Sequence, residues 1–262
     1  MKPNGRSAGQ FRRAICGLLL LAAVSCTAFA SDPQAEQLIV QGDAEVRAMH
    51  PQAALALFEQ AAKADPNNVE IILRIALQYS NLIAAAKTPA EAASCAKRSL
   101  DEAKQAIALA PGNSKAHLAV AVAYGRMTNF EDNRTKVEDS RYVKAEAEKT
   151  LELDPSDDYA YHVLGRWNYS VSTLNPILKL IAKYVYGGMP EASLEEAVHD
   201  YKKAIELAPW RVIHHHELAR AYVALGQMDA ARKEWQTELT LKPEDNESEN
   251  DQKEARTALE KK

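Results

Sequence analysis

The sequence predicts an all-α fold in which five helical hairpins stack into a right-handed solenoid. Three observations lead to that prediction. A proline-terminated phrase recurs along the chain, a small residue holds the eighth position of each repeating unit, and the apolar residues recur at helical spacing.

The composition is compatible with such a fold. The chain has 262 residues, of which 47% are hydrophobic and 26% are charged, with 10 Gly and 11 Pro. This length allows one or two domains, and the apolar fraction excludes wholesale disorder. Three cysteines exclude a disulfide framework, and a formal charge of -4 leaves no basic footprint for non-specific nucleic-acid binding.

The first thirty residues have the pattern of a secretory signal peptide. Four basic residues and no acidic ones accompany the apolar run 14–24, and residues 28–30 (Ala-Phe-Ala) fit a small-x-small cleavage site. We therefore expect export to the periplasm or medium after cleavage near Ala30, with no transmembrane helix in the mature chain. Two alternatives stay open, a lipoprotein anchored at Cys26 and a retained N-terminal membrane anchor. Cleavage would leave 28 basic and 36 acidic residues, and Cys95 as the only cysteine well inside the folded part.

A phrase of small and apolar residues that ends in proline recurs five times. The clearest copies are residues 61–66, 106–111 and 204–209, and weaker copies occupy 150–155 and 238–243. Each proline ends a helix, because its ring clashes with a further helical turn and it donates no amide hydrogen. The prolines lie 45, 44, 54 and 34 residues apart, and the last interval equals the length of a tetratricopeptide repeat. The longer intervals indicate the same unit with insertions.

A small residue at the eighth position lets the two helices of each hairpin approach closely. These residues are Gly42, Ala76, Ala121, Gly165 and Ala219. We therefore predict tetratricopeptide-like repeats at 35–68, 69–113, 114–157, 158–211 and 212–245. Residues 246–262 are highly charged but keep apolar residues at helical spacing, which predicts a polar capping helix or tail at the open end of the solenoid. The alternative is an ordinary helical bundle whose prolines coincide by chance.

The fourth repeat contains the largest insertion, residues 172–190. Asn175 can cap a helix, Pro176 suits its first position and Gly187-Gly188 ends it, so we expect an inserted helix with one apolar stripe. A capping box at 193–196 (Ser-Leu-Glu-Glu) opens the next helix. The inserted helix either packs across the repeat groove, or acts as a lid or interfacial helix that touches ligand or membrane.

The most distinctive motif is a Tyr-His-x-x-Gly-Arg-Trp phrase at residues 161–167. Together with the segments 181–187 and 190–197, it resembles the regulator of microtubule dynamics family, and the likeness extends over residues 36–262. The resemblance implies an all-helical repeat fold, no catalysis and an interaction role, linked in some relatives to microtubules or to organelle contacts and lipids. An exported chain would not meet cytoplasmic microtubules, so export and a microtubule role are competing expectations.

Repeats of this class line their concave side with the first helix of each hairpin. In the third to fifth repeats the lining positions bring cations, histidines and tyrosines together without an acid. They are Lys115, Arg126, Tyr159, His162, Arg166, Tyr169, His216 and Arg220. We expect this basic groove to bind an anionic partner, because the planar fork of Arg takes a carboxylate or phosphate bidentately.

Two functions from different classes follow from this groove. The leading hypothesis is a non-catalytic scaffold for protein–protein interaction, whose groove binds an acidic peptide or protein segment. The alternative is a lipid-binding or lipid-transfer module that takes an anionic lipid, with the 175–187 helix as a lid. A purely structural interpretation also remains, in which Arg166 and Arg220 pair with acids of neighbouring helices and only stabilise the stack.

The catalytic and metal-binding signatures are incomplete. Consecutive helical residues point about 100° apart, so the three histidines at 214–216 cannot converge on one ion, and we expect them to be solvated or to line the groove. Residues 216–220 begin like a zincin motif but place Arg220 where the second ligand belongs. Ser94 and Lys97 match a Ser-x-x-Lys spacing without the Lys-Thr-Gly partner. We expect no enzyme activity, cofactor, metal site or nucleic-acid partner.

Overall fold

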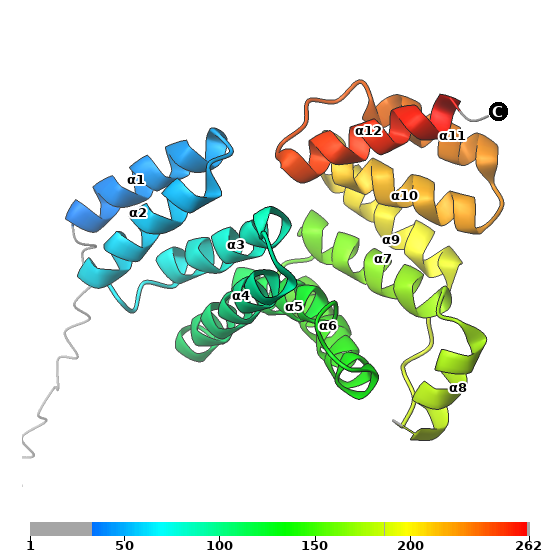
Figure 1. Ribbon diagram of the computed structural model, residues 1–262, viewed down its shortest axis with the longest axis horizontal. Coiled ribbons are helices and arrows are strands. Elements are labelled where there is room, and N and C mark those ends of the chain that lie inside the picture. Colours follow the sequence, from blue (N-terminus) through cyan, green and yellow to red (C-terminus); the bar gives the residue numbers. More distant parts are fainter. Residues whose placement is uncertain (1–32, 186, 261–262) are drawn as a thin grey trace, which may run out of the picture. The chain divides into compact units, whose positions relative to one another are not determined.

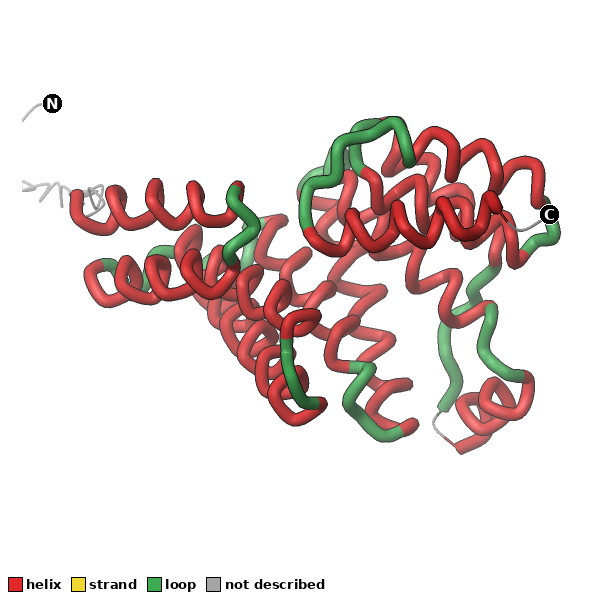
Figure 2. The backbone as a smooth tube through the Cα atoms, turned by 45° about the horizontal axis from the view of Figure 1, so that its top comes forward, coloured by secondary structure: helices red, strands yellow, loops and turns green. Residues whose placement is uncertain are grey.

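The computed structural model describes residues 33–185 and 187–260, which belong to one compact unit, Ser31–Lys262. Every regular element among these residues is an α-helix, and Figure 2 shows helices joined by loops without a strand. The prediction of an all-α fold is therefore confirmed. The expected signal peptide and its cleavage near Ala30 lie outside the described residues.

The helices pair as hairpins in chain order (Figure 1). The first three pairs are α1 (Pro33–Arg47) with α2 (Pro51–Ala64), α3 (Val69–Ala85) with α4 (Pro89–Leu109), and α5 (Ser114–Met127) with α6 (Asn133–Leu153). The other two are α7 (Asp158–Ser172) with α9 (Leu194–Leu207), and α10 (Val212–Ala224) with α11 (Met228–Glu238). Each predicted repeat range holds one hairpin, and α1 begins two residues before its range.

The hairpins stack on one another through both of their helices. The second helix of each hairpin contacts the first helix of the next, as α2 does with α3 and α9 with α10. The first helices also contact each other in the order α3, α5, α7, α10. They therefore form a common layer, which is the layer that lines the binding surface in a helical-repeat solenoid.

The prolines lie just beyond helix ends. Helices α2, α4, α6 and α9 each end two residues before a proline of the recurring phrase. In three of these cases, before α3, α5 and α7, the next helix starts from an Asn or Asp side chain that accepts backbone amides. Asn68 Oδ1 accepts the amides of Glu70 and Ile71 at 3.1 and 3.3 Å, and Asp157 Oδ1 accepts the amide of Ala160 at 2.8 Å. The phrase and the residues after it thus stop one helix and cap the next.

Two hairpins need glycine at the eighth position because an aromatic ring occupies the space of a side chain. A Cβ on Gly165 would lie 2.7 Å from the ring of Tyr201, and a Cβ on Gly42 would overlap the ring of Phe58. Both rings are fully buried. The expected close approach of helices is therefore present in α1/α2 and α7/α9, where backbone packs directly against an aromatic face.

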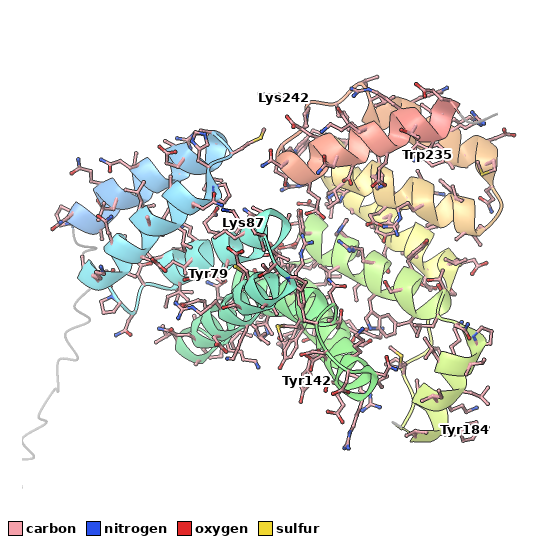
Figure 3. The ribbon with its side chains drawn as sticks, in the orientation of Figure 1. Tyr79, Lys87, Tyr142, Tyr184, Trp235 and Lys242 are labelled. Atoms are coloured by element: carbon pink, nitrogen blue, oxygen red, sulfur yellow. The ribbon has the colours of Figure 1, made fainter. Side chains whose placement is uncertain are left out.

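Two helices lie outside the five hairpins. α12 (Asn246–Glu260) packs on α10 and α11, near Trp235 in Figure 3. α8 (Pro176–Val185) follows α7 and lies apart from the paired helices, connected by loops at both ends (Figures 1 and 2). Over the described part of the chain, no helix combines the length and the hydropathy needed to cross a bilayer.

Candidate binding site

A cavity of about 330 Å³ lies among α5, α6, α7 and α8. Its walls are largely apolar and include Val137 and Val143 of α6, and Val163 and Trp167 of α7. Leu178, Ile181 and Ala182 of α8 form its roof. The volume lies in the range of about 300–1,000 Å³ that is usual for small-molecule sites.

Trp167, from the Gly-Arg-Trp phrase, is a fixed wall of this cavity. Its side chain is buried, and its indole Nε1 donates to both the backbone oxygen and the Oγ of Ser140, each at 2.8 Å. The Nζ of Lys144 on α6 lies 5.0 Å from the ring centroid. Because α6 holds the indole through hydrogen bonds, the aromatic face that borders the cavity is preorganised.

α8, whose residues roof the cavity, is held mainly by hydrogen bonds at and near its ends, and little by packing. Asn175 Oδ1 accepts the amide of Ile177 at 2.8 Å, as the capping prediction requires. Lys179 Nζ donates to the oxygen of Ser172 at 2.6 Å, and Arg141 Nη2 of α6 donates to the oxygen of Gly188 at 2.6 Å. Of the ten residues of α8, all of them described, Ala182 alone is buried. The expected packing of this helix across the groove is therefore limited to the residues that roof the cavity.

Two of the predicted groove arginines, Arg126 and Arg166, line the cavity. Arg126 Nη2 donates to Oε2 of Glu247, at the start of α12, at 2.8 Å. Arg166 Nε lies 3.8 Å from Oε1 of Glu217, and 44% of the Arg166 side chain is exposed. Arg166 is thus the less tightly paired cation of the two.

Arg220, the third groove arginine, faces Glu217 on its own helix and lies outside the cavity lining. Its Nη1 donates to both carboxylate oxygens of Glu217 at 3.0 Å, and its guanidinium lies 5.1 Å from the ring centroid of Tyr169. Lys115, also outside the lining, has its Nζ 3.7 Å from Oε1 of Glu70. The structural interpretation expected Arg166 and Arg220 to pair with acids of neighbouring helices. Arg166 lies near Glu217 of another helix, α10, at 3.8 Å, whereas Arg220 pairs with that acid within its own helix.

Glu247, the acid of α12 that contacts Arg126, lies in a strongly cationic environment. Burial raises the pKa of Glu247, but Arg126, Arg166 and His216 together lower that pKa below its ordinary value. Glu247 therefore stays ionised at neutral pH, and its negative charge balances the arginines at the edge of the cavity.

The three consecutive histidines are buried, so the expectation that they are solvated is wrong, and none of them lines the cavity. Each residue is at most 5% exposed, and each contacts a different carboxylate because successive helical residues point in different directions. The pairs are His214 with Asp158 at 2.8 Å, His215 with Glu234 at 2.8 Å and His216 with Glu238 at 3.2 Å.

His162, which is buried, and Tyr159, which is partly buried, both contact His214 of α10. The Nδ1 atoms of His162 and His214 lie 3.2 Å apart. Burial, with nearby His214 and Arg166, holds the pKa of His162 well below its ordinary value, so the imidazole is neutral. Burial also raises the pKa of Tyr159 to about 12. These two residues line the cavity with uncharged polar groups.

The structure therefore divides the eight predicted site residues. Arg126, Tyr159, His162 and Arg166 meet at one cavity. Lys115, Tyr169, His216 and Arg220 lie outside its lining. The first group comes from the third and fourth repeats and includes two residues of the Tyr-His-x-x-Gly-Arg-Trp phrase.

One group of side chains on α9 has metal-ligand chemistry. Ligand atoms of Glu196, His199 and Asp200 lie within 4.8 Å of one another. The Asp200 carboxylate, however, accepts Nδ2 of Asn168 at 2.9 Å, and burial raises its pKa to about 6. One Asp200 oxygen is thus already engaged by Asn168, and exposed acidic groups are common without an ion, so these three side chains by themselves do not indicate a metal site.

Sequence reasoning missed two parts of this site. Lys136 of α6 lines the cavity but lies in an insertion, outside the repeat positions used to choose candidates. The sequence indicates Glu247 only as part of a polar cap, and its contact with Arg126 joins residues 121 positions apart. The sequence does show an acid, Glu247, at the start of a charged helix. Repeat periodicity, however, does not predict which surface of the solenoid that helix covers, so the contact with Arg126 could not be predicted.

Comparison with known proteins supports the motif-based resemblance. The model of a family described as regulator of microtubule dynamics protein 1-3 matches residues 34–262. Regulator of microtubule dynamics protein 3 of Xenopus laevis is 30% identical over 140 residues, which is 53% of this chain and 30% of that protein. Regulator of microtubule dynamics protein 2 of Homo sapiens is 28% identical over 197 residues, or 74% of this chain and 48% of that protein. The chain thus spans less than half the length of these two relatives.

Two solved structures share the fold. A thermophilic TPR protein from Thermus thermophilus has a TM-score of 0.64 at 16% identity, over 86% of this chain and 98% of that one. MamA from Desulfovibrio magneticus, residues 41 to the end, has a TM-score of 0.50 at 16% identity, over 81% of this chain and 97% of that one. The tetratricopeptide-like solenoid is therefore confirmed.

Proposed function

This chain belongs to the regulator of microtubule dynamics family, and on that premise we propose that it is a non-catalytic binding module whose cavity takes an amphiphile with an anionic head group. The tetratricopeptide-like fold by itself suggests an interaction scaffold. The observation behind the finer proposal is the cavity under α8, which combines apolar walls with Arg166 and Arg126.

The head group would lie against α6 and α7. Arg166 offers a guanidinium fork that is only loosely engaged by Glu217 at 3.8 Å, and Lys136 lines the same cavity. A phosphate or carboxylate placed between these cations gains charge-assisted hydrogen bonds. The neutral imidazole of His162 and the hydroxyl of Tyr159 add polar lining without a competing negative charge.

The apolar tail would lie against the indole of Trp167 and beneath α8. Leu178, Ile181 and Ala182 cover this part of the cavity with hydrocarbon. Since α8 is held by end contacts and buries one residue, it can move away and return with little loss of packed surface. This is the lid role that the sequence left open for the inserted helix.

The groove of α5, α7 and α10 supports a second candidate function, the binding of an acidic protein segment. The supporting observation is the ion pair between Glu247 of α12 and Arg126 of α5 at 2.8 Å. An acidic helix of a partner protein would reach the same arginine by replacing the first turn of α12. We further propose that the chain acts after export, on the basis of its N-terminal signal pattern.

Calorimetric titration with two single-chain amphiphiles tests the cavity proposal. Dodecyl phosphate and dodecyltrimethylammonium have the same tail and opposite head charges. We expect dodecyl phosphate to bind below its micelle concentration and Arg166→Ala to weaken it by about tenfold or more, the loss of one charged hydrogen-bond pair. Ala182→Phe, which fills the cavity from α8, should abolish binding.

The matched control is Leu180→Ser, on the same helix but outside the cavity lining. It should leave dodecyl phosphate binding unchanged. Equal binding of the two amphiphiles, or undiminished binding by the Ala182→Phe variant, would reject the cavity proposal. Titration with a polyglutamate peptide tests the second candidate function, the binding of an acidic protein segment. Such a segment should bind the Glu247→Gln variant more tightly than the unmodified chain, because Arg126 then lacks its carboxylate partner.

A further inference from the structure

The face of α8 that points away from the cavity is apolar and uncovered. Of the fourteen large hydrophobic side chains that are exposed in the described residues, five lie on this ten-residue helix. Ile177, Leu180 and Tyr184 are 69%, 61% and 75% exposed. Figure 3 shows Tyr184 at the end of α8 away from the paired helices. Elsewhere the exposed hydrophobic residues are spread over several helices and loops, which is ordinary for a protein surface.

The three residues share one side of the helix, because positions i, i+3 and i+7 recur on the same face. The residues that roof the cavity, Leu178, Ile181 and Ala182, lie on the adjoining side. The apolar arc of α8 is therefore wider than the cavity needs. A helix that only closed the cavity would require one apolar side, so the second side calls for a further partner.

The charges beside this outward face are positive. Lys179 and Lys183 occupy the part of the helix surface that the apolar arc leaves free, and α8 contains no acidic residue. Lys183 Nζ lies 5.7 Å from the ring centroid of Tyr184, so the cation borders the aromatic ring. Lysines beside an apolar stripe with an aromatic residue are the arrangement of helices that lie in the plane of a membrane interface.

We propose that the outward face of α8 docks on the surface of an anionic lipid bilayer. Ile177, Leu180 and Tyr184 enter the boundary between head groups and acyl chains, and Lys183 stays at the level of the head groups. Lys179, whose Nζ donates to the oxygen of Ser172, adds positive charge beside them. The net negative charge of the chain makes a general electrostatic attraction to such a surface unfavourable. Docking therefore depends on this helix, and it does not rest on the identity of the ligand in the cavity.

The experiment follows one site on α8 in the full-length chain. Cys16, Cys26 and Cys95 are replaced by Ser, and an environment-sensitive fluorophore is attached through Tyr184→Cys. Phosphatidylcholine vesicles with one quarter phosphatidylglycerol should shift its emission to the blue, and pure phosphatidylcholine vesicles should do so only at much higher lipid concentration. Adding Ile177→Ser and Leu180→Ser should raise the lipid concentration for half-maximal shift about tenfold or more, since two buried apolar side chains are lost.

The matched control carries the fluorophore through Val40→Cys on α1, a position that is 66% exposed. The N-terminal apolar segment is present in both proteins, so only a local contact can distinguish them. No blue shift at position 184, an equal shift at position 40, or equal response to neutral and anionic vesicles would overturn the inference. The outcome is separable from the cavity proposal, because Leu180→Ser should impair docking while dodecyl phosphate still binds.

Discussion

The two helices outside the repeat hairpins have opposite composition and opposite burial. α12 has seven charged residues among fifteen, yet Ala255 is fully buried and Gln252 is nearly so. α8 has two charged residues among ten, both lysines, yet buries Ala182 alone. Composition alone would predict that the apolar α8 is buried and that the charged α12 is exposed.

The difference lies in the polar partners that each helix finds. Nε2 of Gln252 donates to the backbone oxygens of Glu238 and Leu241 at 2.8 and 2.9 Å, which satisfies the end of α11. Gln252 thus joins α12 to the backbone at the end of α11 through two hydrogen bonds. α8 meets the repeats through an apolar roof and two end contacts. α12 is thus integrated by specific hydrogen bonds, whereas α8 leaves most of its apolar side chains exposed.

The largest effect should come from an aspartate placed on each of the two helices. Ala255→Asp introduces a carboxylate at a site with no exposed surface and should lower the free energy of unfolding by about 3–5 kcal/mol. Leu180→Asp, at a site 61% exposed, should change it by about 0.5 kcal/mol or less. Chemical denaturation followed by circular dichroism measures both. Equal losses would show that α8 is as integrated as α12.

A smaller effect should appear in the pH dependence of α12 docking. Burial raises the pKa of Asp251 to about 7, with a further contribution from nearby Glu247, Glu238 and Glu217 against the opposing effect of His216. The folded state therefore holds this proton more tightly than the unfolded state. The resulting stabilisation is complete below about pH 4 and is lost as the pH rises through about 7.

Asp251→Asn removes this titration. The variant should match the unmodified chain near pH 4 and exceed its stability by about 1–2 kcal/mol at about pH 8. Burial lowers the pKa of His216, but Glu238, Asp251 and Glu217 together raise it above its ordinary value, so its stabilisation is also lost with rising pH. The variant keeps only the part of this rise that comes from Glu238 and Glu217. Denaturation midpoints across this pH range give the comparison, and a constant difference between the two proteins would contradict the assigned role of Asp251.

The sequence could predict the hairpins because their determinants are local. Proline ends, Asn and Asp caps, and Gly165 opposite a large ring each act within one repeat, so periodicity is sufficient to place them. The ends of α8 were predictable for the same reason. The pairing of Arg126 was not, because its partner lies on another helix 121 residues later and the repeat pattern does not specify how a terminal helix is oriented. The burial of the histidines depends likewise on Asp158, Glu234 and Glu238, which come from other helices.

Glu247→Gln should cost less stability than Ala255→Asp, and this variant links the cap to the cavity. The Glu247 side chain is 39% exposed and that of Arg126 28%, so solvent screens their ion pair and its loss should cost about 1 kcal/mol. The lowered pKa of Glu247 means that its contribution is present above its ordinary value and disappears as the pH falls through the folded value. The loss in the variant should therefore be seen at neutral pH and vanish in strong acid.

The same variant should change the affinity of the cavity. At neutral pH Arg126 would lack its carboxylate partner, so dodecyl phosphate should bind the Glu247→Gln variant more tightly, by about threefold to tenfold in a calorimetric titration. Lys149, paired with Glu152 on α6 at 2.7 Å, offers the control. Glu152→Gln also removes one acid from an ion pair and should leave the affinity for dodecyl phosphate unchanged. An equal gain from both variants would mean that net charge, and not the contact with Arg126, links α12 to the cavity.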